Sequence, residues 1–324
     1  NMLSQAMALD PPVAEPDVLI EEGDQSADSE GDEGSEGASP ANESPSMGMP
    51  SEPMNAPPEA PSPRGERGKS YKRGIASGFD SARDLEALST GISWWYNWSP
   101  SYNDPVADLY AQYELDWVPM TWNGNNPDEI RAFLELHPNV RYLLTFNEPN
   151  FQDQANMTPE YAASIWPTFE AIADEYNVEL IGPAVNFCGG CVVVDGSPID
   201  SNYVVWLDMF FESFRAQFGR EPRMDYTALH WYDYGLEDQV NQIVSRYNKP
   251  VWVTEFALWR SEDWNTDENE RAWLTDMVRY LEGNPMVYRY AWFTGRRPDF
   301  PRINLLANDG ELTPLGQAYL DAPY

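Results

Sequence analysis

Two glutamates occupy positions where a carboxylate is unexpected. Glu148 follows Leu143–Asn147, and Glu255 is the one charged residue of the apolar run Val251–Ala257. Burying an unpaired carboxylate is costly, so an acid in such a place normally has a partner or a task. The common explanation for a carboxylate in an apolar run is a salt bridge to a nearby arginine. We favour catalysis, because two carboxylates can divide the acid, base and nucleophilic roles at one bond.

The rest of the chain must bring these two acids together. From about Lys72, short apolar or β-branched runs alternate with helical stretches, which is the pattern of a parallel sheet covered by helices. The eight predicted strands are Lys72–Ala76, Gly91–Trp98, Asp116–Trp122, Arg141–Asn147, Glu179–Val185, Asp225–Trp231, Pro250–Phe256 and Val287–Phe293.

Helices are predicted between these strands from apolar spacing and start signals such as Pro127 after Asn126. They cover Ser81–Leu88, Pro105–Gln112, a stretch from Asn126, Thr158–Tyr176, Asn202–Phe218, Leu236–Tyr247, Thr266–Glu282 and Pro314–Leu320. Eight such units over about 250 residues match a (β/α)₈ TIM barrel of the α/β class. An open doubly wound sheet is the alternative, but it would want a glycine-rich nucleotide loop after an early strand, and the sequence has none.

In a (β/α)₈ barrel the active site lies at the carboxyl ends of the strands. Glu148 follows the fourth strand and Glu255 lies near the end of the seventh, so both face one barrel mouth. Two carboxylates can flank a glycosidic bond, where one protonates the leaving oxygen and the other attacks the anomeric carbon. A separation of about 5–5.5 Å would make the second a nucleophile and retain configuration.

Other polar and aromatic residues at the strand ends are candidates for substrate binding, because flat rings can stack on the apolar faces of sugars. A single tryptophan is more often a core residue, and His230 could be a satisfied core histidine or could tune a carboxylate pKa. Strand alternation sends Trp94, Tyr96 and Trp98 to one side and Trp95 and Asn97 to the other. The candidates are Asn97, Trp98, Trp122, Asn147, Asn150, His230, Tyr232 and Trp292.

The composition restricts the partners. The 324 residues carry a net charge of -33, which repels nucleic acid and anionic membranes and is compatible with a neutral polysaccharide. The sequence has no run of about 20 apolar residues that would cross a membrane. We expect a monomer.

The N-terminal residues, 1 to about 70, differ from the rest. The first 63 hold 14 Asp and Glu but no Lys or Arg, and no aromatic residue precedes Tyr71. Such a composition cannot bury enough apolar surface to offset the ordering entropy. We therefore predict a disordered acidic linker over 1–70 and a catalytic domain over 71–324.

Cys188 and Cys191 are the only cysteines. A zinc site needs about four ligands, and only His137 and His230 could add to the set, so we expect no metal ion and no cofactor. A redox motif would want a thioredoxin-like context, so a short-loop disulfide is favoured. This suits an oxidising compartment, and the start at Asn1 is compatible with removal of a signal peptide. We expect a secreted or cell-surface-tethered protein.

The ordered motifs of this chain resemble a known family. Asn147-Glu148-Pro149 with Glu255 is similar to the retaining glycosidases of clan A. The more detailed resemblance is to glycoside hydrolase family 128, the Asl1-like β-1,3-glucanases. The matching segments are Lys72–Ala76, Ile92–Trp98, Pro119–Trp122, Phe146–Asn150, His230–Tyr232 and Val253–Phe256.

This resemblance implies that Glu148 is the acid/base, that Glu255 is the nucleophile and that Asn147 holds the sugar 2-hydroxyl. It implies β-1,3-glucan as the substrate, with endo cleavage favoured over exo cleavage. The alternatives are another clan A hydrolase, such as a β-mannanase or cellulase, and a non-catalytic glucan-binding barrel. The acidic N-terminal segment and the Cys188–Cys191 loop are not part of the expected family pattern.

Overall fold

The computed structural model describes residues 68–102, 106, 109–260 and 265–324. The expected linker over residues 1–70 lies almost entirely outside this range, so its disorder and the boundary near residue 70 stay predictions. Among the described residues, no helix combines the length and the apolarity that a membrane crossing requires.

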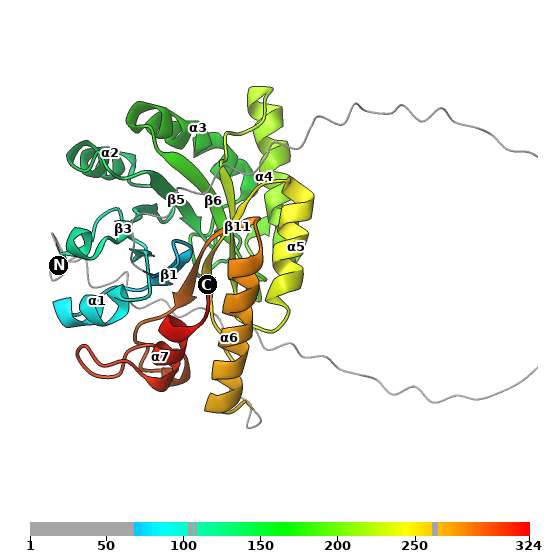
Figure 1. Cartoon of the computed structure of the whole chain (residues 1–324). Coiled ribbons are helices and arrows are strands. Elements are labelled where there is room, and N and C mark those ends of the chain that lie inside the picture. The colour runs from blue at the N-terminus through cyan, green and yellow to red at the C-terminus, as the bar shows by residue number, and fades with distance from the viewer. Residues whose placement is uncertain (1–67, 103–105, 107–108, 261–264) are drawn as a thin grey trace, which may run out of the picture.

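Nine short strands form one sheet with parallel pairing between neighbours, and helices surround it (Figure 1). Its order is β3-β2-β1-β11-β10-β9-β6-β5-β4. The strands are β1 Arg73–Ala76, β2 Trp94–Tyr96, β3 Asp116–Trp117, β4 Met120–Thr121, β5 Tyr142–Asn147, β6 Glu179–Val185, β9 Tyr226–Trp231, β10 Val251–Phe256 and β11 Val287–Phe293.

The two ends of this strand order, β3 and β4, are halves of the single strand predicted at Asp116–Trp122. Between them, the Val118 amide donates to the Trp95 carbonyl at 3.1 Å, and the Pro119 carbonyl accepts from the Leu144 amide at 3.0 Å. The chain thus bonds to β2 on one side and to β5 on the other, and the ring closes. The predicted (β/α)₈ barrel is confirmed.

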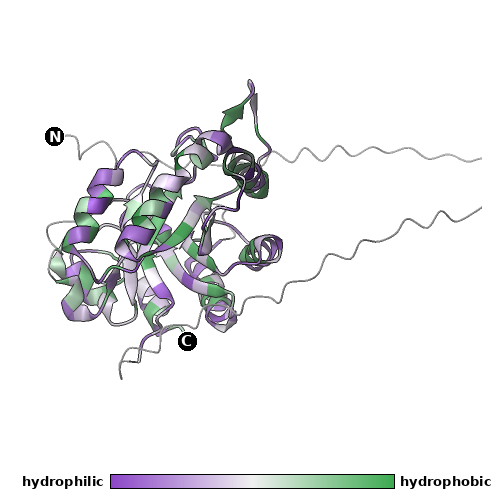
Figure 2. Cartoon of the chain, turned by 90° about the horizontal axis from the view of Figure 1, so that it is seen from above, coloured by the Kyte–Doolittle hydropathy of each residue, from purple (hydrophilic) through white to green (hydrophobic). Residues whose placement is uncertain are grey.

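Seven α-helices are present in the described part of the chain, and side-chain caps begin five of them. Side chains of Ser81, Thr158, Asn202, Thr266 and Thr313 accept from the first turns of α1, α3, α4, α6 and α7. The helices are α1 Ala82–Ser89, α2 Pro127–Leu136, α3 Pro159–Tyr176, α4 Tyr203–Phe218, α5 Leu236–Tyr247, α6 Asp267–Gly283 and α7 Pro314–Asp321. They carry both hydrophilic and hydrophobic residues, as expected of a covering layer (Figure 2).

The predicted helix Pro105–Gln112 is not an α-helix where it is described. Residues 103–105 and 107–108 lie outside the described set, and the chain that follows forms a 3₁₀ turn, η2, at Tyr110–Tyr113. Glu114 ends this turn with a left-handed backbone at φ 56°. A residue in that conformation cannot continue a right-handed helix.

Aromatic rings fill the barrel interior beneath the mouth. Trp252 packs against Trp94 with ring centroids 4.9 Å apart and against Tyr142 at 5.1 Å. The Arg289 guanidinium lies 5.3 Å from the Trp252 ring centroid and donates to Asp116 at 2.6 Å. This filled interior gives the carboxyl ends of the strands a rigid base.

Candidate active site

Glu255, in β10, lies at the centre of a set of hydrogen-bond donors. Its Oε1 accepts from the Tyr96 hydroxyl at 2.8 Å and from the Trp98 indole N–H at 2.7 Å, and its Oε2 accepts from the Tyr232 hydroxyl. The side chain of Glu255 is 4% exposed. Several donors at a buried carboxylate stabilise its charge and fix its orientation.

Glu148 follows β5 directly and adopts a positive φ of 40°. A residue with a Cβ pays of order 1 kcal/mol for that backbone region, and such residues persist where their surroundings hold them. The Glu148 amide donates to the Ala184 carbonyl at 2.8 Å, and the Glu148 carbonyl accepts from the Phe151 amide at 3.0 Å. The carboxyl group is nearly buried, and its Oε1 accepts from the Asn186 side chain at 3.3 Å.

His230, in β9, lies between the two carboxylates. Its Nδ1 is 2.9 Å from Glu148 Oε1, and its Nε2 is 3.4 Å from Glu255 Oε1. The β9–β10 pairing sets this arrangement, since His230 is the register partner of Glu255. One fully buried imidazole therefore contacts both acids.

The two carboxylates perturb the groups around them. Burial and then the charge of Glu255 raise the pKa of Tyr96 and of Tyr232 well above 10, so both hydroxyls stay protonated and donate. Burial lowers the pKa of His230, but the charges of Glu255 and Glu148, with the hydrogen bond to Glu148, outweigh it. The pKa of His230 is therefore above its usual 6.5, and the imidazolium form is favoured.

A group of aromatic side chains adjoins Glu255. The Trp98 and Tyr232 rings both contact Phe293 edge-on, at centroid distances of 5.9 and 5.6 Å. Beyond Phe293, Trp259 stacks on Phe300 at 4.8 Å with an interplanar angle of 7°. All of these except Phe293 are half-buried, so they present ring surface beside the carboxylate.

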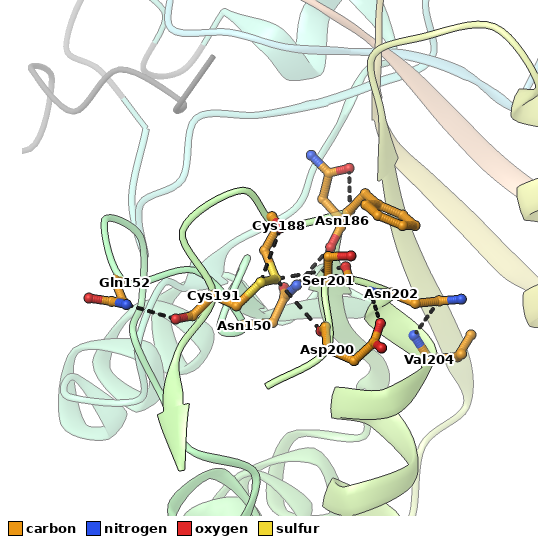
Figure 3. Close-up of a disulfide and its surroundings, with 10 residues drawn as sticks. Asn150, Gln152, Asn186, Cys188, Cys191, Asp200, Ser201, Asn202 and Val204 are labelled. Carbon is orange, nitrogen blue, oxygen red and sulfur yellow. Dashed lines mark hydrogen bonds between the residues drawn. A yellow bond between two sulfur atoms is a disulfide. The ribbon is translucent and has the colours of Figure 1, made fainter. Parts of the chain in front are cut away.

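A disulfide loop adjoins Glu148. Cys188 and Cys191 are bonded with an S–S distance of 2.02 Å, in the segment that follows β6 (Figure 3). The side chain of Gln152 donates to the Cys191 carbonyl at 2.8 Å, and that of Asn150 donates to the Asn186 carbonyl at 2.7 Å. The segment after β5, which carries Glu148, is thus joined to the segment after β6.

Comparisons with known proteins agree with this geometry. Residues 71–319 match the family model of the glycosyl hydrolase catalytic core. A solved subgroup II endo-β-1,3-glucanase of glycoside hydrolase family 128, from Pseudomonas viridiflava, is 46% identical with a TM-score of 0.73, covering 79% of this chain and 99% of that one.

The chain belongs to glycoside hydrolase family 128. A second subgroup II endo-β-1,3-glucanase of this family, from Sorangium cellulosum, is 37% identical with a TM-score of 0.66, covering 78% of this chain and 98% of that one. Alkali-sensitive linkage protein 1 of Schizosaccharomyces pombe is 26% identical over 263 residues, which are 78% of this chain. This chain spans only 44% of the length of that curated relative.

Of the predicted site residues, this family 128 barrel brings five into one cluster. Glu148, Glu255, His230, Trp98 and Tyr232 are joined by direct contacts. The predicted alternation is also correct, because Trp94 stacks on Tyr96 and Tyr96 contacts Trp98 inside the barrel.

Four further candidates lie near this cluster in supporting positions. The side chain of Asn147 donates to Gln154 at 3.2 Å, and its amide N–H donates to the carbonyl of half-buried Trp122 at 2.8 Å. Asn150 is fully buried and joins the two loops. Asn97 is half-buried just after β2.

The structure does not bring Trp292 to the barrel mouth. It is fully buried, its indole N–H donates to the Ile303 carbonyl at 2.8 Å, and its ring packs against Trp273 of α6 and Tyr319 of α7. Its ring therefore faces the helix layer. We predicted that Trp292 contacts sugar because it lies near the end of its strand. That prediction neglected the alternation of side chains along a strand, which turns Trp292 toward the helices.

Sequence reasoning missed two residues that contact the carboxylates. Tyr96 bonds Glu255, and alternation had already assigned it to the same side as Trp98. Asn186 bonds Glu148 and is the first residue after β6. Position at a strand end was the available signal for Asn186.

Proposed function

We propose that this family 128 hydrolase is an endo-acting β-1,3-glucanase that retains anomeric configuration. The observation that carries the proposal is the pair of buried carboxylates on either side of His230 at the carboxyl ends of β5 and β10. The linkage and the endo mode are supported by the two subgroup II endo-β-1,3-glucanases at 46% and 37% identity.

We assign the acid/base role to Glu148. Its Oε1 accepts from the Asn186 side chain, so the proton of the acid form is carried by Oε2. In the first step this proton goes to the glycosidic oxygen, and the leaving glucan departs. In the second step Glu148 takes a proton from water, and that water attacks the anomeric carbon.

We assign the nucleophile role to Glu255. The hydroxyls of Tyr96 and Tyr232 and the indole of Trp98 donate to its carboxylate. These donors hold one carboxylate oxygen in position for attack on the anomeric carbon. The bond from that carbon to the leaving oxygen breaks as the bond to Glu255 forms, and the second step reverses the inversion.

The function is tested by following the products released from laminarin over time and by identifying, with NMR, the anomer that is released first. We expect a ladder of oligosaccharides released first as the β-anomer, and little release from cellulose or mannan. Early release of glucose alone would contradict endo action, and first release of the α-anomer would contradict retention. Release from mannan or cellulose in preference to laminarin would contradict the linkage.

Isosteric amides at the two carboxylates test the assigned roles. We expect Glu148→Gln and Glu255→Gln each to lower kcat by roughly 10²–10⁴-fold. Glu268→Gln, an exposed position in α6, is the matched control and should retain full activity. Full hydrolysis by Glu255→Gln would overturn the assignment of the nucleophile.

We further propose that the enzyme acts outside the reducing cytosol, either secreted or tethered at a cell surface. The Cys188–Cys191 disulfide supports this, since such bonds persist in oxidising compartments. Localisation of the tagged chain in its source cells, with thiol labelling of the isolated protein, checks it. A cytosolic protein with two free thiols would refute it.

A further inference from the structure

We propose that Phe187 and Trp231 form a binding site for the glucosyl unit on the leaving-group side of the scissile bond, and that the Cys188–Cys191 loop holds this site in place. The inference rests on the proposed β-1,3-glucanase activity and adds a substrate subsite to it. It also assigns a task to the disulfide loop.

The first argument is position. Glu148 Oε1 has two contacts, Asn186 and His230, and the next residue after each is aromatic. Phe187 lies two residues after β6, and Trp231 is the last residue of the neighbouring strand β9. Their rings meet edge to face, with centroids 6.4 Å apart and planes at 81°.

The second argument is exposure. The Phe187 side chain is 44% exposed, although its ring contacts half-buried Trp231 and the preceding residue bonds Glu148. The Trp231 indole N–H already donates to the Tyr234 carbonyl at 2.9 Å, which fixes the ring. An exposed ring face beside a fixed indole can cover the apolar C–H face of a pyranose.

The third argument is the anchoring of the loop. The Phe187 amide donates to Asn186 Oδ1 at 2.7 Å, and the Cys188 amide donates to the Ser201 carbonyl at 3.1 Å. On the far side of the disulfide, the Val192 amide donates to the Asn150 carbonyl at 2.8 Å. Ordering a loop costs conformational entropy. Because this loop is already ordered before the substrate binds, that cost does not weaken substrate binding.

The side of the bond follows from the roles of the two acids. Glu148 delivers its proton to the leaving-group oxygen, so the rings beside Glu148 face the leaving glucan. The aromatic group beside Glu255, which includes Trp98 and Trp259, faces the glucosyl unit that is attacked. A glucan chain would thus cross from the Trp259 side to the Phe187 side.

Two substrates separate this subsite from the catalytic groups. Laminarihexaose fills both sides of the cleft, whereas β-laminaribiosyl fluoride loses fluoride and places no sugar on the leaving-group side. For Phe187→Ala we expect kcat/KM to fall about tenfold on the hexaose, the size typical of one lost ring contact, and to stay unchanged on the fluoride. The matched control is Phe218→Ala, a 40% exposed ring at the end of α4, which should change neither rate.

The outcomes are distinguishable. Wild-type enzyme that cleaves neither substrate refutes the proposed function. Active wild-type enzyme with a Phe187→Ala variant unchanged on the hexaose, or equally impaired on both substrates, refutes the subsite. The double variant Cys188→Ser/Cys191→Ser should show the same selective loss on the hexaose, and unchanged hexaose cleavage would remove the disulfide from the proposal.

Discussion

A single imidazole contacts both acids of this site, so its protonation state acts on both. His230 lies within 2.9 Å of Glu148 and 3.4 Å of Glu255 through its two ring nitrogens. As an imidazolium it offsets part of the repulsion between two nearby carboxylates. The raised pKa of His230 is the expected sign of that stabilisation, because a group that binds its proton more tightly in the folded state adds stability when protonated.

This coupling predicts a pH dependence of stability. The contribution of His230 is fully present below its unfolded pKa of about 6.5 and is lost as the pH rises through the higher folded pKa. We therefore expect the melting temperature of the wild type to exceed that of His230→Asn most at pH 5.5–6, and the gap to narrow toward pH 9. Thermal unfolding of both proteins across this range measures the gap, and a constant difference would contradict the prediction.

At the residue scale the sequence predicted the site because of where the charges fell. Glu255 in an apolar run and Glu148 after a strand could be recognised from the type and position of a single residue. For Asn186 the position at a strand end was the one signal, because its contact with Glu148 depends on a loop conformation joined to Asn150. Trp292 was misplaced because a residue at a strand end can still face the helices.

Helix α6 contains a buried acid outside the site. Glu270, in its first turn, is 1% exposed, and its Oε2 accepts from Asn265 at 3.2 Å. Burial raises the pKa of Glu270 to about 7, although the hydrogen bond from Asn265 and the charge of Arg302 oppose the rise. The ionised carboxylate of Glu270 therefore destabilises the folded chain. It does so in α6, the helix that follows β10, which carries Glu255.

Removing the charge of Glu270 should stabilise the fold at neutral and alkaline pH. A carboxyl whose folded pKa is raised above 4.5 costs stability as the pH rises from that value through 7. We expect Glu270→Gln to gain up to roughly 3 kcal/mol at pH 8 and nothing near pH 4. Chemical denaturation at both pH values measures this, with exposed Glu268→Gln as the control. A variant less stable than the wild type at pH 8 would show that hydrogen bonding outweighs the charge.

At the element scale, apolar and β-branched runs predicted the strands, and apolar spacing with start signals predicted the helices. Six strands match their predicted ranges within one residue at each end. The third strand broke in two because Pro119 has no N–H to donate to a ladder. The turn at Tyr110–Tyr113 was predicted as helix, because apolar spacing does not distinguish a 3₁₀ turn from an α-helix.

At the scale of the whole molecule, we propose that the net charge limits self-association. With a net charge of -33, two copies repel each other at distances within the Debye length of about 8–10 Å at moderate salt. We expect light scattering to report a mass of 36.9 kDa at all protein concentrations in 0.1 M salt. A mass of twice this value would contradict a monomer.

The closure of the ring between β3 and β4 also affects behaviour in concentrated solution. An open sheet exposes a row of unpaired amides and carbonyls on which a foreign strand can grow, and this is a common start of fibril formation. Here the nine-stranded sheet has no such row within the described residues, because the chain between Trp117 and Met120 bonds to β2 on one side and to β5 on the other. Templated growth would first have to pull this seam apart at Pro119, so the seam is the place where a destabilised variant would become prone to self-association.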